Sequence, residues 1–584
     1  MSQPPPAWAR PALPLRVWAR HYNRATLAQD GVAAMIVTVM LIPQSLAYAL
    51  LAGLPPQAGL YASIAPLLLY AVFGSSRVLA VGPVAVVSLM TASAIGSLAP
   101  AGSPQYWTAA LVLALLSGVL LLLMGLLRLG FLASFLSHPV ISGFVSASGL
   151  LIALGQLKTL MGVKAQGEHF FSLALDLLRQ APAANPHSLG LGLGTLLFLL
   201  WTRKRLKPLL LGHGLSAALA DGLSRAAPVA AIAASILLTW GLGWTAQGVA
   251  VVGQVPQGLP PWSWPVWDAA LYRSLLVPAL LIAIVGFVES VSVGQTLAAR
   301  RRQRIDPDQE LVALGVGNLG AAFTSGFPVT GGFARSVVNF DAGAQTPAAG
   351  AMTALGIALA TLLLTPVLYH LPLATLAATI IVAVLSLVDL GMLRRTWGYS
   401  RSDFAAALVT LLGTLAFGVE VGLLTGVSLS LALFLHRTSR PHMAVIGQVE
   451  GTEHFRNVQR HPVHVEPALL GLRVDGSLYF ANARSLEDRM NAEVAARPGL
   501  RHVVLQCSAI NFIDTSALEA LQAIQHRLKE ADITLHLSEV KGPVMDRLQR
   551  SGFLKQLDGP VFLTHFQAVQ ALTGQPASSR IREI

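Results

Sequence analysis

Long apolar blocks dominate the first three quarters of the chain. The run from residue 111 to residue 127 is interrupted only by one serine and two glycines, and residues 354–368 and 423–435 are similarly apolar. A segment of about 20 apolar residues crosses a bilayer as a helix, because lipid offers the backbone no hydrogen-bond partner. The pattern therefore predicts a polytopic α-helical membrane protein.

We predict about fourteen spans, of which the third and tenth are short. They divide into two halves of about seven, and halves with an odd number of spans have opposite orientations, so we expect inverted repeats. The predicted cores are residues 30–48, 57–73, 83–98, 106–127, 131–157, 188–201, 228–244, 274–298, 309–324, 332–341, 349–369, 373–389, 404–418 and 421–436.

The pattern changes near residue 437, after which charges recur every few residues and no apolar run is long enough to span a bilayer. We therefore expect three parts: a basic, proline-rich arm at residues 1–26, a transmembrane domain at 27–437 and a soluble domain at 438–584. In the soluble domain, residues 468–480, 503–507 and 533–537 resemble strands. Residues 485–496, 516–530 and 543–551 resemble amphipathic helices, so this domain is expected to be α/β.

Composition agrees with a membrane protein. Hydrophobic residues make up 54% of the chain and charged residues only 12%, against about 25% charged in soluble domains. The net charge of +12 comes from residues at the ends of apolar spans, so we expect no nucleic-acid partner. The single cysteine, Cys507, excludes a disulfide framework and a cysteine-based metal site, and we expect no metal, no cofactor and no enzymatic activity.

The distribution of basic residues predicts the orientation. With the N-terminus in the cytoplasm, the loops after even-numbered spans are cytoplasmic, and these loops carry most of the lysine and arginine, including residues 203–207 and 300–304. Residues 247–267 contain three tryptophans among prolines, as expected at the outer interface. Asp389 and Glu420 fall at span ends, and we interpret both as boundary residues.

The two short spans carry the candidate chemistry. The third opens at Gly82-Pro83-Val84-Ala85 and the tenth after residues 326–332, and such matching interrupted segments are typical of a transporter site. Two half-helices starting at mid-membrane would direct free N–H groups at one point and attract an anion. Arg335 would add a full positive charge there, and the alternative is a purely structural pairing of Arg335 with a carboxylate or carbonyl.

Glu289 is a second costly residue, because it lies deep in the eighth span. We expect it to exchange a proton during transport. The alternative is a permanently protonated or hydrogen-bonded structural glutamate.

These segments resemble the SulP (sulfate permease) family of anion transporters. The resemblance rests on residues 43–49 (PQSLAYA), 51–56 (LAGLPP), 73–77 (FGSSR) and 330–336 (TGGFARS), and it covers nearly the whole chain. It implies an inverted-repeat fold with core and gate domains, elevator-like movement and a homodimer. By motif position it implies that the anion is bound by Gln44, Tyr48, Val84, Ala85, Ala334, Arg335 and Ser336, with Glu289 as the coupling carboxylate.

Residues 507–517 (CSAINFIDTSA) resemble the STAS domain motif, shared with anti-sigma-factor antagonists. The resemblance implies a regulatory phosphorylation site at Ser516. The alternative, which we favour, is that Asp514 and Ser516 cap the following helix. We expect Cys507 to be buried and inert.

The leading hypothesis is secondary active, proton-coupled sulfate uptake across a bacterial inner membrane, with both termini cytoplasmic. Sodium is the less favoured coupling ion, because Val293 stands where sodium-coupled relatives are expected to have a hydroxyl. No Gly-x-x-x-x-Gly-Lys-Ser/Thr motif is present, so transport should use ion gradients. Bicarbonate or dicarboxylate (fumarate-like) transport, a channel-like anion conductance and a membrane-bound sensor signalling through Ser516 remain alternatives.

Overall fold

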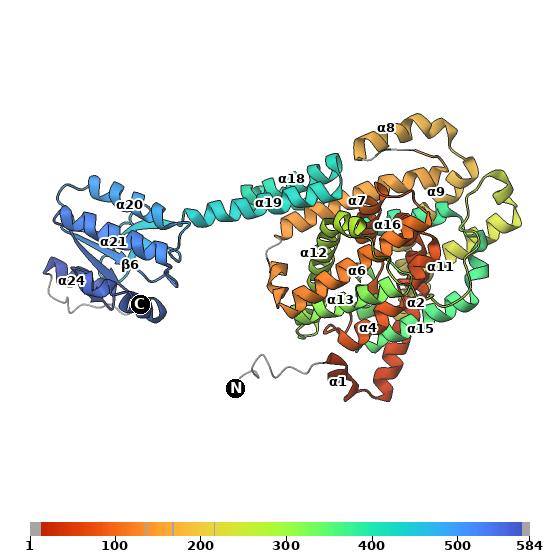
Figure 1. The fold of residues 1–584 in the computed structure, drawn as a ribbon, viewed down its shortest axis with the longest axis horizontal. Helices are drawn as coiled ribbons and strands as arrows, with labels where there is room; N and C mark the ends of the chain where they lie inside the picture. Colours follow the sequence, from red (N-terminus) through yellow and green to blue (C-terminus); the bar gives the residue numbers. More distant parts are fainter. Residues whose placement is uncertain (1–12, 135–136, 166, 168, 215, 575–584) are drawn as a thin grey trace. The chain divides into compact units, whose positions relative to one another are not determined.

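The computed structural model describes residues 13–134, 137–165, 167, 169–214 and 216–574. The chain separates into two compact units, residues 1–430 and 431–584, each of which can be followed in Figure 1. Residues 1–12 of the predicted arm and residues 575–584 of the predicted soluble domain lie outside the described residues.

Helices predominate in the described part of the N-terminal unit, which also contains two short strands, β1 (Val81–Gly82) and β2 (Thr330–Gly331). The helices before β2 are α1 Pro14–Ala19, α2 Arg24–Leu51, α3 Pro56–Tyr61, α4 Ala65–Phe73, α5 Ala85–Gly96, α6 Pro104–Leu126, α7 His138–Met161, α8 Phe170–Gln180, α9 Pro186–Trp201, α10 Lys207–Gly212, α11 Ala217–Gly241, α12 Ala269–Arg300 and α13 Pro307–Phe323. After β2 come α14 Phe333–Asp341, α15 Ala348–Leu363, α16 Leu373–Leu385, α17 Gly391–Tyr399, α18 Arg401–Phe417 and α19 Val419–Ser439.

Each predicted span core overlaps a helix or a pair of consecutive helices, and residues 135 and 136 of the core 131–157 lie outside the described residues. Among the described residues, six helices are long and apolar enough to cross a membrane, or seven if the bent pair Phe170–Ala183 and Pro186–Gly212 forms one span. Shorter apolar helices such as α5 and α16 fall below that length. The helical membrane fold is therefore confirmed, and the number of spans stays a prediction.

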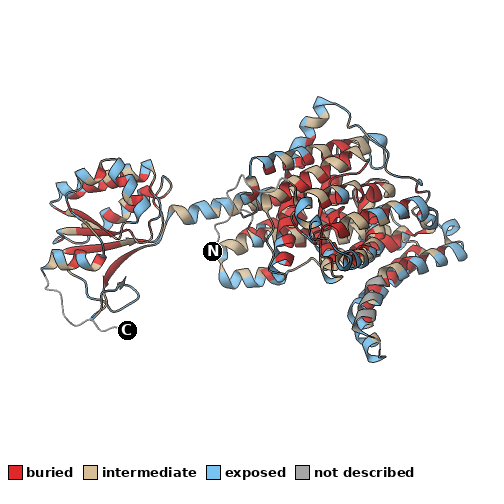
Figure 2. Ribbon diagram, turned by 90° about the horizontal axis from the view of Figure 1, so that it is seen from below, coloured by how far each residue is buried: buried red, intermediate tan, exposed pale blue. Residues whose placement is uncertain are grey.

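Small residues bring the central helices together, and large apolar residues cover the outside. Gly118 of α6 and Gly315 of α13 face each other so closely that a Cβ atom on either would lie within 3.0 Å of the other's carbonyl oxygen. Such contacts let membrane helices approach closely. Leu126 and Trp240 are 68% and 66% exposed, as expected of side chains that face lipid. Figure 2 shows buried residues along the inner faces of the packed helices and exposed residues on the outer faces.

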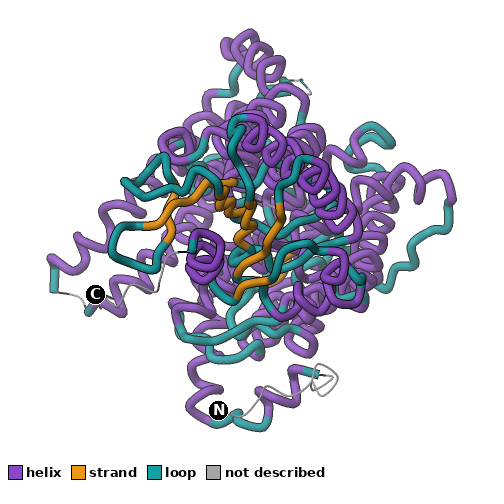
Figure 3. Tube along the Cα trace, turned by 90° about the vertical axis from the view of Figure 1, so that its left-hand side faces the viewer, coloured by secondary structure: helices purple, strands orange, loops and turns teal. Residues whose placement is uncertain are grey.

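The C-terminal unit is an α/β domain built on one six-stranded sheet in the order β4-β3-β5-β6-β7-β8 (Figure 3). β3 runs antiparallel to β4 and β5, and β5 to β8 are parallel. The strands are β3 Met443–Gln448, β4 Phe455–Asn457, β5 Leu469–Val474, β6 His502–Gln506, β7 Thr534–Ser538 and β8 Val561–Phe562. The helices are α20 Ala483–Ala495, α21 Thr515–Glu530, α22 Gly542–Arg550, α23 Phe553–Gln556 and α24 His565–Thr573.

The sequence pattern located the parallel strands β5, β6 and β7 and the helices α20, α21 and α22, but it extended the first strand too far. The expected strand 468–480 ends at Val474, and the chain bends at Gly476, next to the ion pair between Arg473 and Asp475. The pattern also missed β3, β4, β8 and α24, whose apolar runs are short.

Candidate functional site

A two-residue ladder joins the two segments that the sequence singled out. Val81 pairs with Gly331 and Gly82 with Thr330, so two segments about 250 residues apart lie side by side. α5 begins directly after β1 and α14 directly after β2. The ladder therefore brings two helix N-termini together inside the helical unit.

Neither helix start is capped by a side chain. Val84 and Gly332 are the N-cap residues of α5 and α14, and neither makes a side-chain cap hydrogen bond. By contrast, α2, α6 and α12 begin with Asn23, Ser103 and Asp268, whose side chains accept from the first turn. The uncapped N–H groups leave partial positive charge at the point where α5 and α14 meet.

Arg335 lies in the first turn of α14 and is only 2% exposed. Its terminal nitrogens, Nη1 and Nη2, have no hydrogen-bond partner among the described residues. A buried guanidinium normally forms hydrogen bonds or ion pairs, because desolvation of an unpaired charge is costly. The geometry therefore leaves several donors available to an anionic ligand.

Two glycines make room for this guanidinium. A Cβ atom at Gly82 would lie 2.7 Å from Arg335 Nη1, and one at Gly332 would lie 2.9 Å from Nε and Nη2. Gly82 also has φ 156°, in the region that favours glycine. The backbone at Gly82 and Gly332 therefore packs directly against the Arg335 guanidinium.

Most of the predicted site residues line a small cavity of about 40 Å³. Ser336 is absent from its lining: the Ser336 hydroxyl donates to Gly332 O at 2.7 Å and accepts from Ala80 N at 3.0 Å, so it ties α14 to β1. The lining is Gln44, Tyr48, Val84, Ala85, Val86, Glu289, Gly332, Phe333, Ala334, Arg335, Ala383, Val384 and Leu387.

Glu289 reaches the same cavity from α12. Among the described residues, the Glu289 carboxyl group forms no hydrogen bond and no direct ion pair with Arg335. Its neighbour Ser290 holds β2, because the Ser290 hydroxyl accepts from Gly331 N at 2.8 Å and lies 2.7 Å from Thr330 Oγ1. The carboxyl group is therefore available to a proton or water next to the cationic end of the cavity.

A wider cavity of about 380 Å³ adjoins the small one. The linings of the two cavities share Gln44, Tyr48, Ala334 and Ala383. The wider cavity also reaches Arg203, which lies in a π-helical turn at Thr202–Leu206. The two cavities together form a route toward Arg335 for a small ligand.

Sequence reasoning missed two buried carboxylates that hold the loops beside the half-helices. Glu310 of α13 accepts from Tyr70 Oη, from the N–H and hydroxyl of Ser75 and from Ser76 N at 2.7–3.0 Å. Asp30 of α2 accepts from Gln345 N and from the N–H and hydroxyl of Thr346 at 2.6–3.2 Å. A carboxylate in a predicted apolar helix is the signal that would have found both residues.

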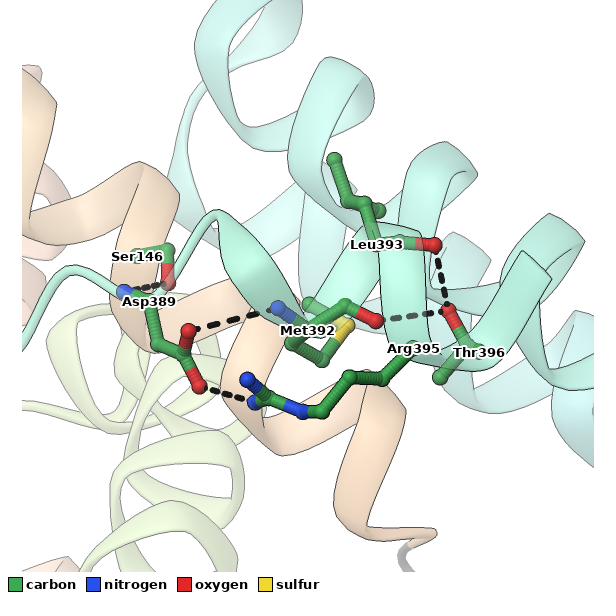
Figure 4. Close-up of polar contacts among 6 residues, drawn as sticks. All are labelled: Ser146, Asp389, Met392, Leu393, Arg395 and Thr396. Atoms are coloured by element: carbon green, nitrogen blue, oxygen red, sulfur yellow. Dashed lines mark hydrogen bonds and ion pairs between the residues drawn. The ribbon is translucent and has the colours of Figure 1, made fainter. Parts of the chain in front are cut away.

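Asp389, interpreted as a boundary residue, organises the turn before α17 (Figure 4). Its N–H donates to Ser146 Oγ at 3.0 Å, and its carboxylate accepts from Met392 N at 3.2 Å and pairs with Arg395. Glu420 lies in the first turn of α19, where a negative charge is favoured. Neither residue lines either cavity.

In the C-terminal unit, Asp514 caps α21 by accepting from Ala517 N at 2.9 Å. Ser516 makes no such cap and its side chain is exposed in the first turn.

Cys507 is 2% exposed, and burial, followed by the charge of Glu539, raises the pKa of its thiol to about 12, so few thiolates form at neutral pH.

Known proteins resemble the chain along almost its whole length. The profile of the sulfate permease family matches residues 27–410, and that of the STAS domain matches residues 460–568. The chloroplastic sulfate transporter 4.1 of Arabidopsis thaliana is 36% identical over 99% of this chain and 84% of its own. A probable sulfate transporter of Mycobacterium tuberculosis is 34% identical over 94% of this chain and 96% of its own.

Solved structures share the fold. The murine solute carrier 26 family member A9 anion transporter, in an inward-facing state, superimposes with a TM-score of 0.88 at 22% identity over 98% of this chain and 97% of its own. The transmembrane domain of the cyanobacterial bicarbonate transporter BicA gives 0.59 at 21% identity, over 69% of this chain and 98% of its own. The chain therefore belongs to the sulfate permease family of membrane transporters, which are not enzymes, and carries a C-terminal STAS domain.

Proposed function

We propose that the chain moves small anions across a membrane by secondary active transport, with sulfate as the first candidate substrate. The observation that carries this proposal is the buried Arg335 guanidinium, whose terminal nitrogens have no partner where two uncapped helix N-termini meet. Charge-assisted hydrogen bonds from an arginine and backbone N–H groups are well suited to an oxyanion. The names of the relatives, which include sulfate transporters, favour sulfate.

Gln44, Tyr48, Val84, Ala85 and Ala334 are proposed to complete the anion site, since they line the same cavity. Ser336 is proposed to support the site, because both of its hydrogen bonds hold the α14 start against β1. An anion there would replace the missing partners of Arg335 and offset its desolvation.

Protons are proposed as the coupling ion through Glu289. Its carboxyl group lies in the anion cavity without a hydrogen-bond partner. Protonation of Glu289 would make the cavity more positive and favour anion binding, which couples the two ligands. An elevator-like movement, a homodimer, a bacterial inner membrane and cytoplasmic termini are part of the same proposal.

Uptake into proteoliposomes tests the function. Labelled sulfate, bicarbonate and fumarate are supplied in turn, each with and without a pH or sodium gradient. We expect saturable sulfate uptake that an inward proton gradient accelerates. Uptake of bicarbonate or fumarate without uptake of sulfate would show that sulfate is not the substrate. Non-saturating flux without any gradient dependence would indicate a channel-like conductance.

A further inference from the structure

A basic pocket lies on the face of the STAS sheet opposite its main core. Val445, Leu472 and Val503 face α20–α22 in that core. On the other face α24 packs mainly on β6, β7 and β8, with Ala568 against Val504. Among the described residues, no helix packs extensively on the C-terminal end of β5 or on the start of β3 at this second face.

The pocket at this end has a volume of about 580 Å³. Five of its seven lining residues are arginine or histidine, and only one is acidic. The lining is His442, Arg456, Asn457, Arg460, His461, Arg473 and Asp475. A concave surface with this charge balance favours an anionic ligand.

The one acidic residue is already neutralised. Asp475 pairs with Arg473 at 2.6 Å and with His442 at 2.7 Å. The side chains of Arg456 and Arg460 are exposed and make no hydrogen bond or ion pair with any described residue. Two guanidinium groups in one pocket are thus available for an oxyanion such as a phosphate.

A short segment of chain connects α19 to the first residue of the pocket lining, His442. Only Arg440 and Pro441 separate the end of α19 from His442, and two or three residues of chain span at most about 10 Å. The final turn of α19 is also bonded to the domain, because Thr438 O accepts from the buried Asn482 Nδ2 at 3.4 Å. Because this connection is short, the first lining residue, His442, lies near the end of α19.

We infer that this pocket binds the phosphate of an anionic phospholipid headgroup and so docks the STAS domain on the leaflet at the end of α19. The inference rests on the proposed membrane placement and on the cytoplasmic leaflet, which carries the anionic lipid. Arg456 and Arg460 supply charge-assisted donors to the phosphate, while Arg473 and His442 hold Asp475 away from it. Each such basic residue strengthens attachment to an anionic surface by about fivefold.

Hydrogen exchange on the full chain in nanodiscs tests this inference independently of transport. Exchange at residues 455–461 is compared in discs of phosphatidylcholine alone and in discs with increasing phosphatidylglycerol. We expect slower exchange in this segment as phosphatidylglycerol increases. In the double variant Arg456→Gln/Arg460→Gln the phosphatidylglycerol dependence should be lost, since two contacts together contribute about 30-fold in affinity.

A matched control removes the same charge elsewhere. Arg484 and Arg550 are exposed residues of the same domain that do not line the pocket. The variant Arg484→Gln/Arg550→Gln should keep the full lipid dependence, and an equal loss in both variants would show non-specific attraction and overturn the inference. Equal exchange in the two lipids would also overturn it, as would equal protection by inorganic phosphate in discs of phosphatidylcholine alone.

Discussion

At the scale of single residues, Arg335 is both a candidate for anion binding and a buried charge that is costly to desolvate. Its buried guanidinium has unpaired terminal nitrogens, so its removal should not lower the melting temperature of the anion-free protein. Arg335→Ala should instead raise the KM for sulfate by at least about 100-fold, since two charge-assisted hydrogen bonds are lost. Uptake kinetics measure this change.

Thermal unfolding separates this role from a structural one. Sulfate should raise the melting temperature of the unaltered protein, because a ligand that binds only the folded state stabilises it, and Arg335→Ala should abolish this rise. Arg273→Ala, at an exposed position of α12, serves as the control and should retain it. Unfolding of anion-free Arg335→Ala at a much lower temperature would favour the structural role.

Gly332 should act on the anion through Arg335. Its φ of −92° is allowed for alanine, but the new Cβ atom would lie 2.9 Å from Arg335 Nε and Nη2. Because a flexible guanidinium can move, Gly332→Ala should keep the fold and weaken sulfate affinity by about tenfold or more. Gly96→Ala, whose Cβ meets nothing within 4 Å, should leave affinity unchanged in the same binding titration.

Glu289 should carry the coupling proton. Glu289→Gln should lose sulfate accumulation driven by a pH gradient but keep exchange of labelled for unlabelled sulfate, because the anion site remains and the titrating group is gone. Both modes are measured in proteoliposomes. Glu420→Gln, at the start of α19 and away from the cavity, should behave like the unaltered protein. Persistent pH-driven accumulation in Glu289→Gln would exclude Glu289 from coupling.

At the scale of elements, the half-helices are held by carboxylates from distant segments. Glu310 accepts four hydrogen bonds from the segment before β1 and from α4. In Glu310→Gln an amide N–H₂ faces buried donors, so several bonds are lost at about 1.5–3 kcal/mol each. We expect a clearly lower melting temperature together with weaker sulfate affinity.

Asp308 provides the comparison for this prediction. It lies on the same helix, α13, and its carboxylate accepts a hydrogen bond from Gly130 N at 2.8 Å. Asp308→Asn should therefore lower the melting temperature much less than Glu310→Gln. Equal melting temperatures for Glu310→Gln and the unaltered protein would show that the carboxylate does not position the segment before β1.

At the scale of the whole molecule, the STAS domain should lose stability in acid. Burial lowers the pKa of His565 to about 4, below its ordinary value of 6.5. The folded domain therefore binds fewer protons than the unfolded chain between these pH values, and stability falls as pH decreases from 6.5 to 4. The loss from His565 is about 3 kcal/mol. Hydrogen exchange at β7 in the full chain, measured across this pH range, reports it.

His565→Gln should reduce this acid sensitivity, whereas the exposed His526→Gln should not. His536 contributes in the same direction, because burial and then the charge of His502 lower its pKa to about 4. Exchange at β7 that is independent of pH after correction for the intrinsic rate would contradict the prediction.

The sequence by itself determined the class of the protein and the position of each main helix, because long apolar runs must form helices in lipid. It also singled out Arg335 and Glu289 as candidate site residues, since a charge within an apolar run is visible in the sequence pattern alone. It did not determine the number of spans, because short apolar helices such as α5 and α16 are shorter than a bilayer crossing.

Only the tertiary structure decided which residues meet. The pairing of Val81 with Gly331 brings two helix starts together across the sequence, and the contacts of Asp30 and Glu310 join segments more than 200 residues apart. The same packing turned the Ser336 hydroxyl into an internal tie instead of a cavity group. Hydrogen-bond partners depend on three-dimensional proximity, which the periodicity of a single segment does not encode.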